Sequence, residues 1–280
     1  MCQRLMLFLM VFIFSSGVMA RELKYLDMNG IGEDIIGFAV LKLALDKVDR
    51  EYQLSIDSTI VNRARATFMI ESGQFDVADF SSSLELDGKL EPIYLPLEMG
   101  LLGWRVFIIR EDMAETLTPV RTIEDLKPFT FGQGQWVDVG ILESSGFTVV
   151  TTAKLNNLFK MLQGGRFDLL PLGGNEAHRL LKRFGNKDAK LMVDKSIVLI
   201  YPFGRFFYVR KNDDELIKDI KTGMEQALSD GSLLSLLKSH PFSRDIFEKL
   251  HLNERVQIRI ENPYLTEGFT AIDPKWWYSP

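Results

Sequence analysis

Polar side chains follow several short apolar runs of this 280-residue sequence, at points where strands are predicted to end. Asp27 follows the first of these runs, and Ser81, Ser82 and Ser83 follow the third. Serine hydroxyls and the backbone N–H groups of such turns suit an anionic group, but serines at strand ends also act as plain turn residues. Both interpretations of the serines remain open.

A glycine-rich turn at residues 132–138 (GQGQWVD) leads from a predicted strand into a predicted helix. Glycines let a ligand approach the backbone, the first N–H groups of a helix favour a carboxylate or phosphate, and an indole offers a stacking face. The Gly-Lys-Ser/Thr of a phosphate loop is missing. Gln133, Gln135 and Trp136 are therefore candidates for ligand binding, whereas Asp138 either joins them or only favours the helix dipole.

Two further positions could bring charge to the same site. Residues 173–176 (GGNE) again join a predicted strand to a helix, where Asn175 either caps the helix or contacts a ligand. Glu176 follows it as a ligand-binding candidate. Arg105 lies near the predicted passage between two lobes, where a guanidinium could reach a ligand or form a structural ion pair.

Catalytic and metal-binding motifs are sparse. The three histidines, His178, His240 and His251, are not spaced as metal ligands, and neither Gly-x-Ser-x-Gly nor His-Glu-x-x-His occurs. The one cysteine, Cys2, lies in a segment that we expect to be removed. We therefore expect no catalytic residues, no metal and no cofactor.

The charge and composition limit the class of protein. A formal net charge of −5 argues against a basic surface that grips nucleic acid. Hydrophobic residues make up 46% and charged residues 25%, which is typical of a globular domain and excludes a disordered chain. Carboxylate pairs such as Asp76 and Asp79 are interpreted as charges of helices or turns.

The first twenty residues have the pattern of a secretory signal peptide. Arg4 precedes the apolar run 5–14 (LMLFLMVFIF), and small residues lie before Arg21. The run is too short to span a hydrocarbon layer of about 30 Å. We expect cleavage after Ala20 and a mature chain in the periplasm, without a free thiol.

The elements that must position the candidate residues alternate between strands and helices. Strands are predicted at 23–26, 52–56 and 75–80 and helices at 35–48 and 62–71, an order typical of a parallel α/β sheet. A second α/β unit follows, and extended runs around 105–112 and 197–209 bracket it. This bracketing favours two lobes joined by two crossover strands that form a hinge, with a single doubly wound domain as the alternative. The expected first lobe comprises residues 21–110 and 200–280, and the inserted second lobe comprises residues 111–199.

Several phrases resemble family 3 periplasmic solute-binding proteins. They are residues 71–76 (ESGQFD), 122–127 (TIEDLK), 165–168 (GRFD), 201–203 (YPF), 209–213 (VRKND) and 228–233 (LSDGSL), in the family's order. The resemblance implies the type II periplasmic-binding fold of amino-acid ABC-transporter binding proteins. Its partners would be a small-molecule solute and an inner-membrane permease or sensor, and the protein would be a monomer.

The ligand-binding residues of the family are not all present. Members usually carry an arginine that clamps the ligand carboxylate shortly after the first-lobe Gly-x-x-Asp, and here that window reads 85–88 (ELDG) with only Lys89 nearby. The usual second-lobe aspartate is absent as well, and only Glu176 could substitute for it. The resemblance therefore does not imply a standard α-amino-acid ligand.

We expect a solute-binding protein, or a binding-protein-like sensor component, that closes two lobes around a small polar or anionic solute. One alternative is a dehydratase-type enzyme on the same fold, with Glu176 as general acid and base. Another is an interaction module without a ligand. The aromatic C-terminal extension, residues 262–278, either packs across the first lobe or offers a docking strip.

Overall fold

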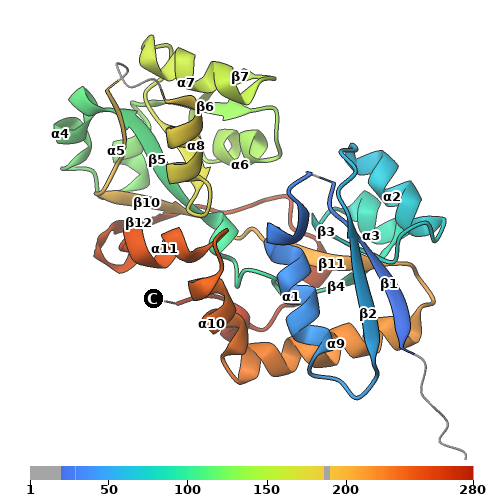
Figure 1. The fold of residues 1–280 in the computed structure, drawn as a ribbon. Helices are drawn as coiled ribbons and strands as arrows, with labels where there is room; N and C mark the ends of the chain where they lie inside the picture. Colours follow the sequence, from blue (N-terminus) through green and yellow to red (C-terminus); the bar gives the residue numbers. More distant parts are fainter. Residues whose placement is uncertain (1–19, 29, 186–189, 280) are drawn as a thin grey trace, which may run out of the picture.

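The computed structural model describes residues 20–28, 30–185 and 190–279. The predicted signal peptide, apart from Ala20, lies outside the described residues. The described chain forms two α/β lobes, one at the upper left and one at the lower right of Figure 1. The prediction of a two-lobed α/β fold is thereby confirmed.

The first lobe is built on a five-stranded sheet in the order β2-β1-β3-β11-β4. β1 runs parallel to β2 and β3, whereas β11 is antiparallel to β3 and β4. Alternation of apolar and polar residues in β1 and β2 turns one face toward the core, where Leu23 is buried and its partner Leu54 is half-buried. The strands are β1 (Arg21–Leu26), β2 (Tyr52–Asp57), β3 (Val77–Ser81), β4 (Glu91–Ile93) and β11 (Arg205–Val209).

Helices cover this sheet because each has an apolar face. α1 and α9 pack against each other so closely that a Cβ at Gly223 would lie 1.9 Å from the carbonyl oxygen of Ala44. Asn62 caps α2 by accepting the Arg65 N–H at 2.9 Å, so Arg63 is the first residue of that helix. The helices are α1 (Ile36–Leu45), α2 (Arg63–Glu71), α3 (Leu84–Lys89), α9 (Asp214–Ser229), α10 (Ser232–Ser239) and a short α12 (Glu267–Thr270).

The second lobe contains a sheet in the order β12-β10-β5-β8, with β9 paired to β5. A separate pair, β6 and β7, is connected to it by a bridge between Phe131 and Leu169. The strands are β5 (Trp104–Arg110), β6 (Thr130–Gly134), β7 (Thr148–Thr152), β8 (Leu170–Gly173), β9 (Leu191–Val193), β10 (Ile197–Ile200) and β12 (Val256–Arg259). The helices are α4 (Ala114–Leu117), α5 (Ile123–Leu126), α6 (Asp138–Ser144), α7 (Leu155–Gln163), α8 (Ala177–Phe184) and α11 (Arg244–Lys249).

The chain passes between the lobes four times: once through residues 240–243 between α10 and α11, and three times through irregular segments that we call the crossing segments. They are residues 94–103 between β4 and β5, residues 201–204 between β10 and β11, and residues 260–266 after β12. The sheets divide the chain differently from the expected boundaries at 110 and 199. β5 and β10 pair with each other in the second sheet, and the C-terminal strand β12 joins them there.

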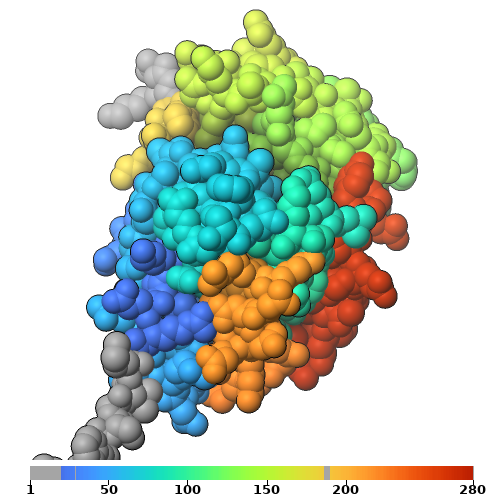
Figure 2. Space-filling model, turned by 90° about the vertical axis from the view of Figure 1, so that its right-hand side faces the viewer, coloured from blue at the N-terminus to red at the C-terminus, as the bar shows by residue number. Residues whose placement is uncertain are grey.

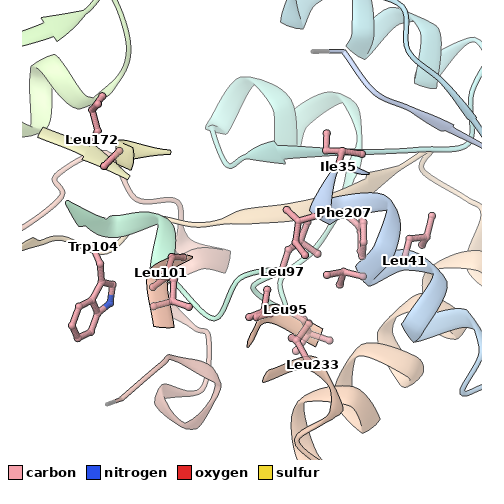
Figure 3. Close-up of a cluster of buried hydrophobic side chains, with 14 of the residues drawn as sticks. Ile35, Leu41, Leu95, Leu97, Leu101, Trp104, Leu172, Phe207 and Leu233 are labelled. Atoms are coloured by element: carbon pink, nitrogen blue, oxygen red, sulfur yellow. The ribbon is translucent and has the colours of Figure 1, made fainter. Parts of the chain in front are cut away.

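A buried apolar cluster extends along the first crossing segment into both lobes. Figure 3 shows Leu95, Leu97 and Leu101 between Phe207 of the first lobe and Leu172 of the second. These side chains are almost completely buried. The passage between the lobes is therefore packed and is not a free linker.

The C-terminal segment, residues 260–279, packs back over the crossing segments and the first lobe. Thr266 and Tyr94 share a hydrogen bond of 2.5 Å between their hydroxyl groups, and the ring of Phe269 meets that of Phe206 edge-on at 5.5 Å. Figure 2 shows this segment in red along one side of the molecule, beside the green second lobe and the teal and orange parts of the first. Trp277 covers Gly100, whose φ of +76° and bare Cα suit glycine.

Candidate functional site

Arg105, Asp138 and Tyr201 form a buried network at the base of the second lobe. Arg105 Nη2 lies 2.6 Å from Asp138 Oδ1, and each side chain is 7% exposed. The Tyr201 hydroxyl donates a short hydrogen bond to the same oxygen, and the guanidinium carbon lies 5.3 Å from the Tyr201 ring centroid. Burial alone would lower the pKa of Arg105, but the interactions of the guanidinium with Asp138, Tyr201 and Glu176 together outweigh burial, and the pKa is raised. Burial raises the pKa of Tyr201, so its hydroxyl stays protonated as a donor.

Asn175 and Glu176 lie beside this network, at the turn between β8 and α8. Glu176 Oε1 accepts the Gly173 N–H at 3.2 Å, and burial raises the pKa of this carboxyl against the opposing charge of Arg105. Among the described residues, Asn175 Oδ1 and Arg105 Nε are buried atoms without a hydrogen-bond partner. A Cβ at Gly173 would lie 2.8 Å from Asn175 Oδ1 and 3.5 Å from Arg105 Nη1, so both side chains crowd this turn.

A second buried network lies on the facing side of the first lobe. Arg205 on β11 donates to both oxygens of Glu98, at 2.9 and 3.1 Å, and its Nη1 lies 2.9 Å from Asp79 Oδ2. The Tyr25 hydroxyl donates a short hydrogen bond to Asp79. The interpretation of Asp79 as a helix or turn charge was wrong, because it lies within β3 and is buried.

Asn175, which lies beside the first network, contacts the second, since its Nδ2 donates to Glu98 Oε1 at 3.4 Å. We call these two networks, together with Asn175 and Glu176, the floor between the lobes. The floor contains two guanidinium groups and three buried carboxylates, those of Asp79, Glu98 and Asp138. Its formal charge is therefore 2 − 3 = −1 before Glu176 is counted. An acidic floor disfavours the anionic end of a solute and favours a donor.

The rim of the first lobe has the opposite character. Arg63 Nη2 donates to Ser81 Oγ at 2.7 Å, and Ser83 caps α3 by accepting the Leu86 N–H at 3.3 Å. A hollow of about 150 Å³ lies here, lined by Arg63, the three serines including Ser82, Val137 of the second lobe, and Tyr264 of the third crossing segment. An exposed guanidinium beside hydroxyl groups suits a carboxylate or another small anion.

The glycine-rich turn is only partly directed toward this rim. Gln133 is buried, and its Oε1 accepts the N–H of Gly134 at 3.0 Å, which indicates a structural role. Gln135 and Trp136 are exposed, and the Trp136 ring covers Gly134. Val137 is the residue of this turn that lines the hollow.

Asp27 accepts hydrogen bonds from the backbone of the loop that follows it. Its buried Oδ2 accepts the N–H groups of Ile31 and Gly32, at 2.5 and 2.7 Å. These bonds fix the turn that leads to the short 3-10 helix η1 (Gly32–Asp34). Asp27 does not line the rim hollow.

The structure therefore groups the predicted residues into a rim and a floor. Ser81, Ser82 and Ser83 lie at the rim, whereas Arg105, Asn175 and Glu176 lie at the floor. Sequence reasoning missed the residues that complete these two groups, namely Arg63, Glu98, Tyr201 and Arg205. A signal for Arg63 existed, because Asn62 is a good N-cap and fixes a basic residue at a helix start.

The other titratable groups of the described residues form no metal-binding cluster. No group of three or more His, Cys, Asp or Glu side chains among the described residues could hold a metal ion. His240 Nδ1 accepts the Phe242 N–H at 3.2 Å, and burial lowers the pKa of both His178 and His240. In the part of the chain that the structure describes, no helix is long and apolar enough to cross a membrane.

Comparisons with known proteins give similarity in structure only. No protein-family model and no curated protein sequence matches the chain. Among solved structures, the probable amino-acid ABC transporter extracellular-binding protein ytmK from Bacillus subtilis superposes with a TM-score of 0.60 at 14% identity, over 79% of this chain and 97% of that one.

Two other solved structures give the same result. An amino-acid ABC transporter substrate-binding protein from Streptococcus pneumoniae, bound to L-arginine, has a TM-score of 0.52 at 13% identity, over 79% of this chain and 93% of that one. YckB from Bacillus subtilis has a TM-score of 0.56 at 17% identity, over 85% and 96%. The chain therefore has the type II periplasmic-binding fold that the sequence phrases implied.

Proposed function

We propose that the chain is a solute-binding protein, or the binding-protein-like component of a sensor, that holds a small polar or anionic solute between its lobes. The observation that carries this proposal is the pair of Arg63 and Ser81, which faces Val137 of the other lobe across the rim hollow. Ligands of open α/β sheets bind at such strand ends. The similar structures with binding descriptions support the proposal at the level of fold.

The charges orient the solute. Arg63 and the serine hydroxyl groups at the rim would take its anionic group, because the floor is acidic. An amino or hydroxyl group of the solute would then point toward Glu98 and the unpartnered Asn175 Oδ1. In this arrangement Arg63, on α2, replaces the arginine that the family usually supplies after β3.

The solute would act by favouring one arrangement of the lobes, since it contacts both of them. A membrane permease or a sensor would then recognise that arrangement. Export through the predicted signal peptide agrees with the start of β1 at Arg21, because cleavage after Ala20 would leave the sheet whole.

The test is a thermal-shift screen of the full mature chain against small carboxylates, amino acids, phosphates and amines. Each stabilising compound is then titrated by calorimetry into the wild type, Arg63→Gln and the matched control Arg65→Gln. Arg65 lies on the same helix but over the Phe68 ring, 5.3 Å from its centroid. Loss of a charge-assisted hydrogen bond of about 1.5 kcal/mol predicts roughly tenfold weaker binding for Arg63→Gln alone. No stabilising compound, or equal effects of the two variants, would contradict the proposal.

One observation favours a second candidate, a protein-interaction module that binds no solute. The floor is filled by side chains, and the rim hollow of about 150 Å³ is smaller than the roughly 300–1,000 Å³ of most small-molecule sites. A chain that binds no compound in the screen, yet is captured by a specific membrane protein of its host, would support this candidate instead.

A further inference from the structure

A larger hollow lies behind the rim, between the three crossing segments and residues 269–278 at the end of the chain. Its volume is about 480 Å³, within the range of roughly 300–1,000 Å³ typical of small-molecule sites. It shares Phe203, Leu265 and Phe269 with the rim hollow, so these three side chains line both hollows. We call it the hinge cavity.

Six aromatic residues of the described chain line the hinge cavity, and most of the other residues in its wall are apolar. Trp104 meets Tyr278 edge-on at 5.7 Å, and the rings of Phe269 and Trp277 lie 5.2 Å apart. Trp277 is held in place because Gly100 leaves room for its ring. Such walls offer both faces and edges to a planar apolar molecule.

The described wall of the hinge cavity carries a single positive charge and no negative charge. Arg259 is the one charged residue among the described residues that line it, and no aspartate or glutamate lines it. The Arg259 guanidinium carbon lies 5.9 Å from the Trp104 ring centroid, and Nη2 donates to Gln257 Oε1 at 3.1 Å. An exposed guanidinium at the edge of an apolar cavity complements a carboxylate on an apolar body.

We propose that the hinge cavity is a second ligand site, separate from the rim, for a small aromatic carboxylate. The ring would lie against the aromatic side chains of the cavity wall, and the carboxylate would pair with Arg259. Met99 of the first crossing segment, Pro202 of the second and Leu265 of the third all line the cavity, so a bound molecule would contact each of the three crossing segments. Such a ligand would favour whichever lobe arrangement fits it better.

The test uses indole-3-acetate as the probe and indole-3-acetamide as its uncharged analogue, titrated by calorimetry into the full mature chain. We expect indole-3-acetate to bind with a Kd below about 1 mM, and the amide to bind about tenfold more weakly. Arg259→Gln should weaken binding of the acid about tenfold and leave the amide unchanged. Lys218→Gln is the matched control, since it removes an exposed cation on α9, away from the cavity.

A second variant keeps the test independent of the charge. Thr270 is an exposed residue of the cavity wall, and Thr270→Trp should fill the cavity and abolish binding of both probes while circular dichroism remains that of the wild type. Absence of binding to the wild type, or binding unchanged in both Arg259→Gln and Thr270→Trp, would overturn the proposal. Binding of rim solutes in Thr270→Trp reports on the rim site separately.

Discussion

The buried ion pair of Arg105 and Asp138 gives the sharpest prediction about what holds the floor together. Asp138→Asn keeps an oxygen for the Tyr201 hydroxyl but leaves the Arg105 guanidinium without its closest counter-charge. Removing one partner of a buried pair costs about 3–5 kcal/mol, because the other charge stays desolvated. Glu176 lies close enough to lower this cost, since its charge also acts on Arg105. We therefore expect a loss of about 3 kcal/mol in the free energy of unfolding.

The assay is urea unfolding at pH 7, followed by far-UV circular dichroism and by tryptophan fluorescence. A loss of about 3 kcal/mol corresponds to a fall in Tm of roughly 6–12 °C for a chain of this size. The control is Glu124→Gln. Glu124 pairs with Lys127 at the same distance of 2.6 Å, but the two side chains are 76% and 41% exposed. An exposed pair contributes about 0–1 kcal/mol, so the control should unfold almost as the wild type does.

A double-mutant cycle separates the pair from other effects. If the ion pair dominates, Arg105→Gln and Asp138→Asn together should cost less than the sum of the two single variants, with a coupling of about 1–3 kcal/mol. A loss below about 1 kcal/mol for Asp138→Asn, comparable with the exposed control, would refute the reasoning that burial sets the strength of this pair.

Two further predictions concern packing and pH. Gly37→Ala should destabilise the chain by about 1–3 kcal/mol in urea unfolding, because its Cβ would lie 2.2 Å from the Tyr25 hydroxyl; Gly88→Ala, with no atom within 4 Å of its Cβ, should not. A loss in both or in neither would contradict this. Burial raises the pKa of Asp213, but the hydrogen bonds and charge of Arg21, the Leu216 N–H and the charge of Arg210 together outweigh burial, and the pKa is lowered. This carboxylate therefore stabilises the fold above its unfolded pKa of about 3.9, and the contribution is lost as the pH falls through the folded value. Urea unfolding should show Asp213→Asn less stable than the wild type at pH 6 and equal to it near pH 2; a difference independent of pH would argue against the linkage.

Much of the fold could be predicted from local patterns. The apolar periodicity of residues 35–48 and 62–71 corresponds to α1 and α2, and the break at Pro202 and Gly204 separates β10 from β11, which belong to different sheets. The pairing of β12 with β10 could not be predicted, because partners so far apart in the chain leave no local signal. For the same reason the sequence predicts the C-terminal part in the first lobe alone.

The candidate site could be predicted in part, because strand ends converge at one edge of a sheet. This rule identified Ser81 and Asn175, which the structure places at the rim and the floor. It could not identify Arg205 or Glu98, since their roles arise from pairing across the chain. The rule also selected Gln133, whose side chain instead bonds to the next backbone N–H.

The C-terminal segment changes what closure of the lobes would involve. Its Tyr264 packs against Gly140 in α6 of the second lobe, and Asn262 Nδ2 donates to the Pro202 carbonyl oxygen at 2.9 Å. Residues 260–266 thus contact the second lobe and also the second crossing segment. Any rotation between the lobes must carry this third crossing segment with it.

The most direct test of the central claim is a crystal structure of the mature chain purified from its own host, refined for density between the lobes. We predict a small bound molecule whose anionic group contacts Arg63 and Ser81 and whose other end points toward Asn175 and Glu98. A rim occupied only by water in the wild type, together with no stabilising compound in the screen, would contradict the claim that this fold holds a solute between its lobes.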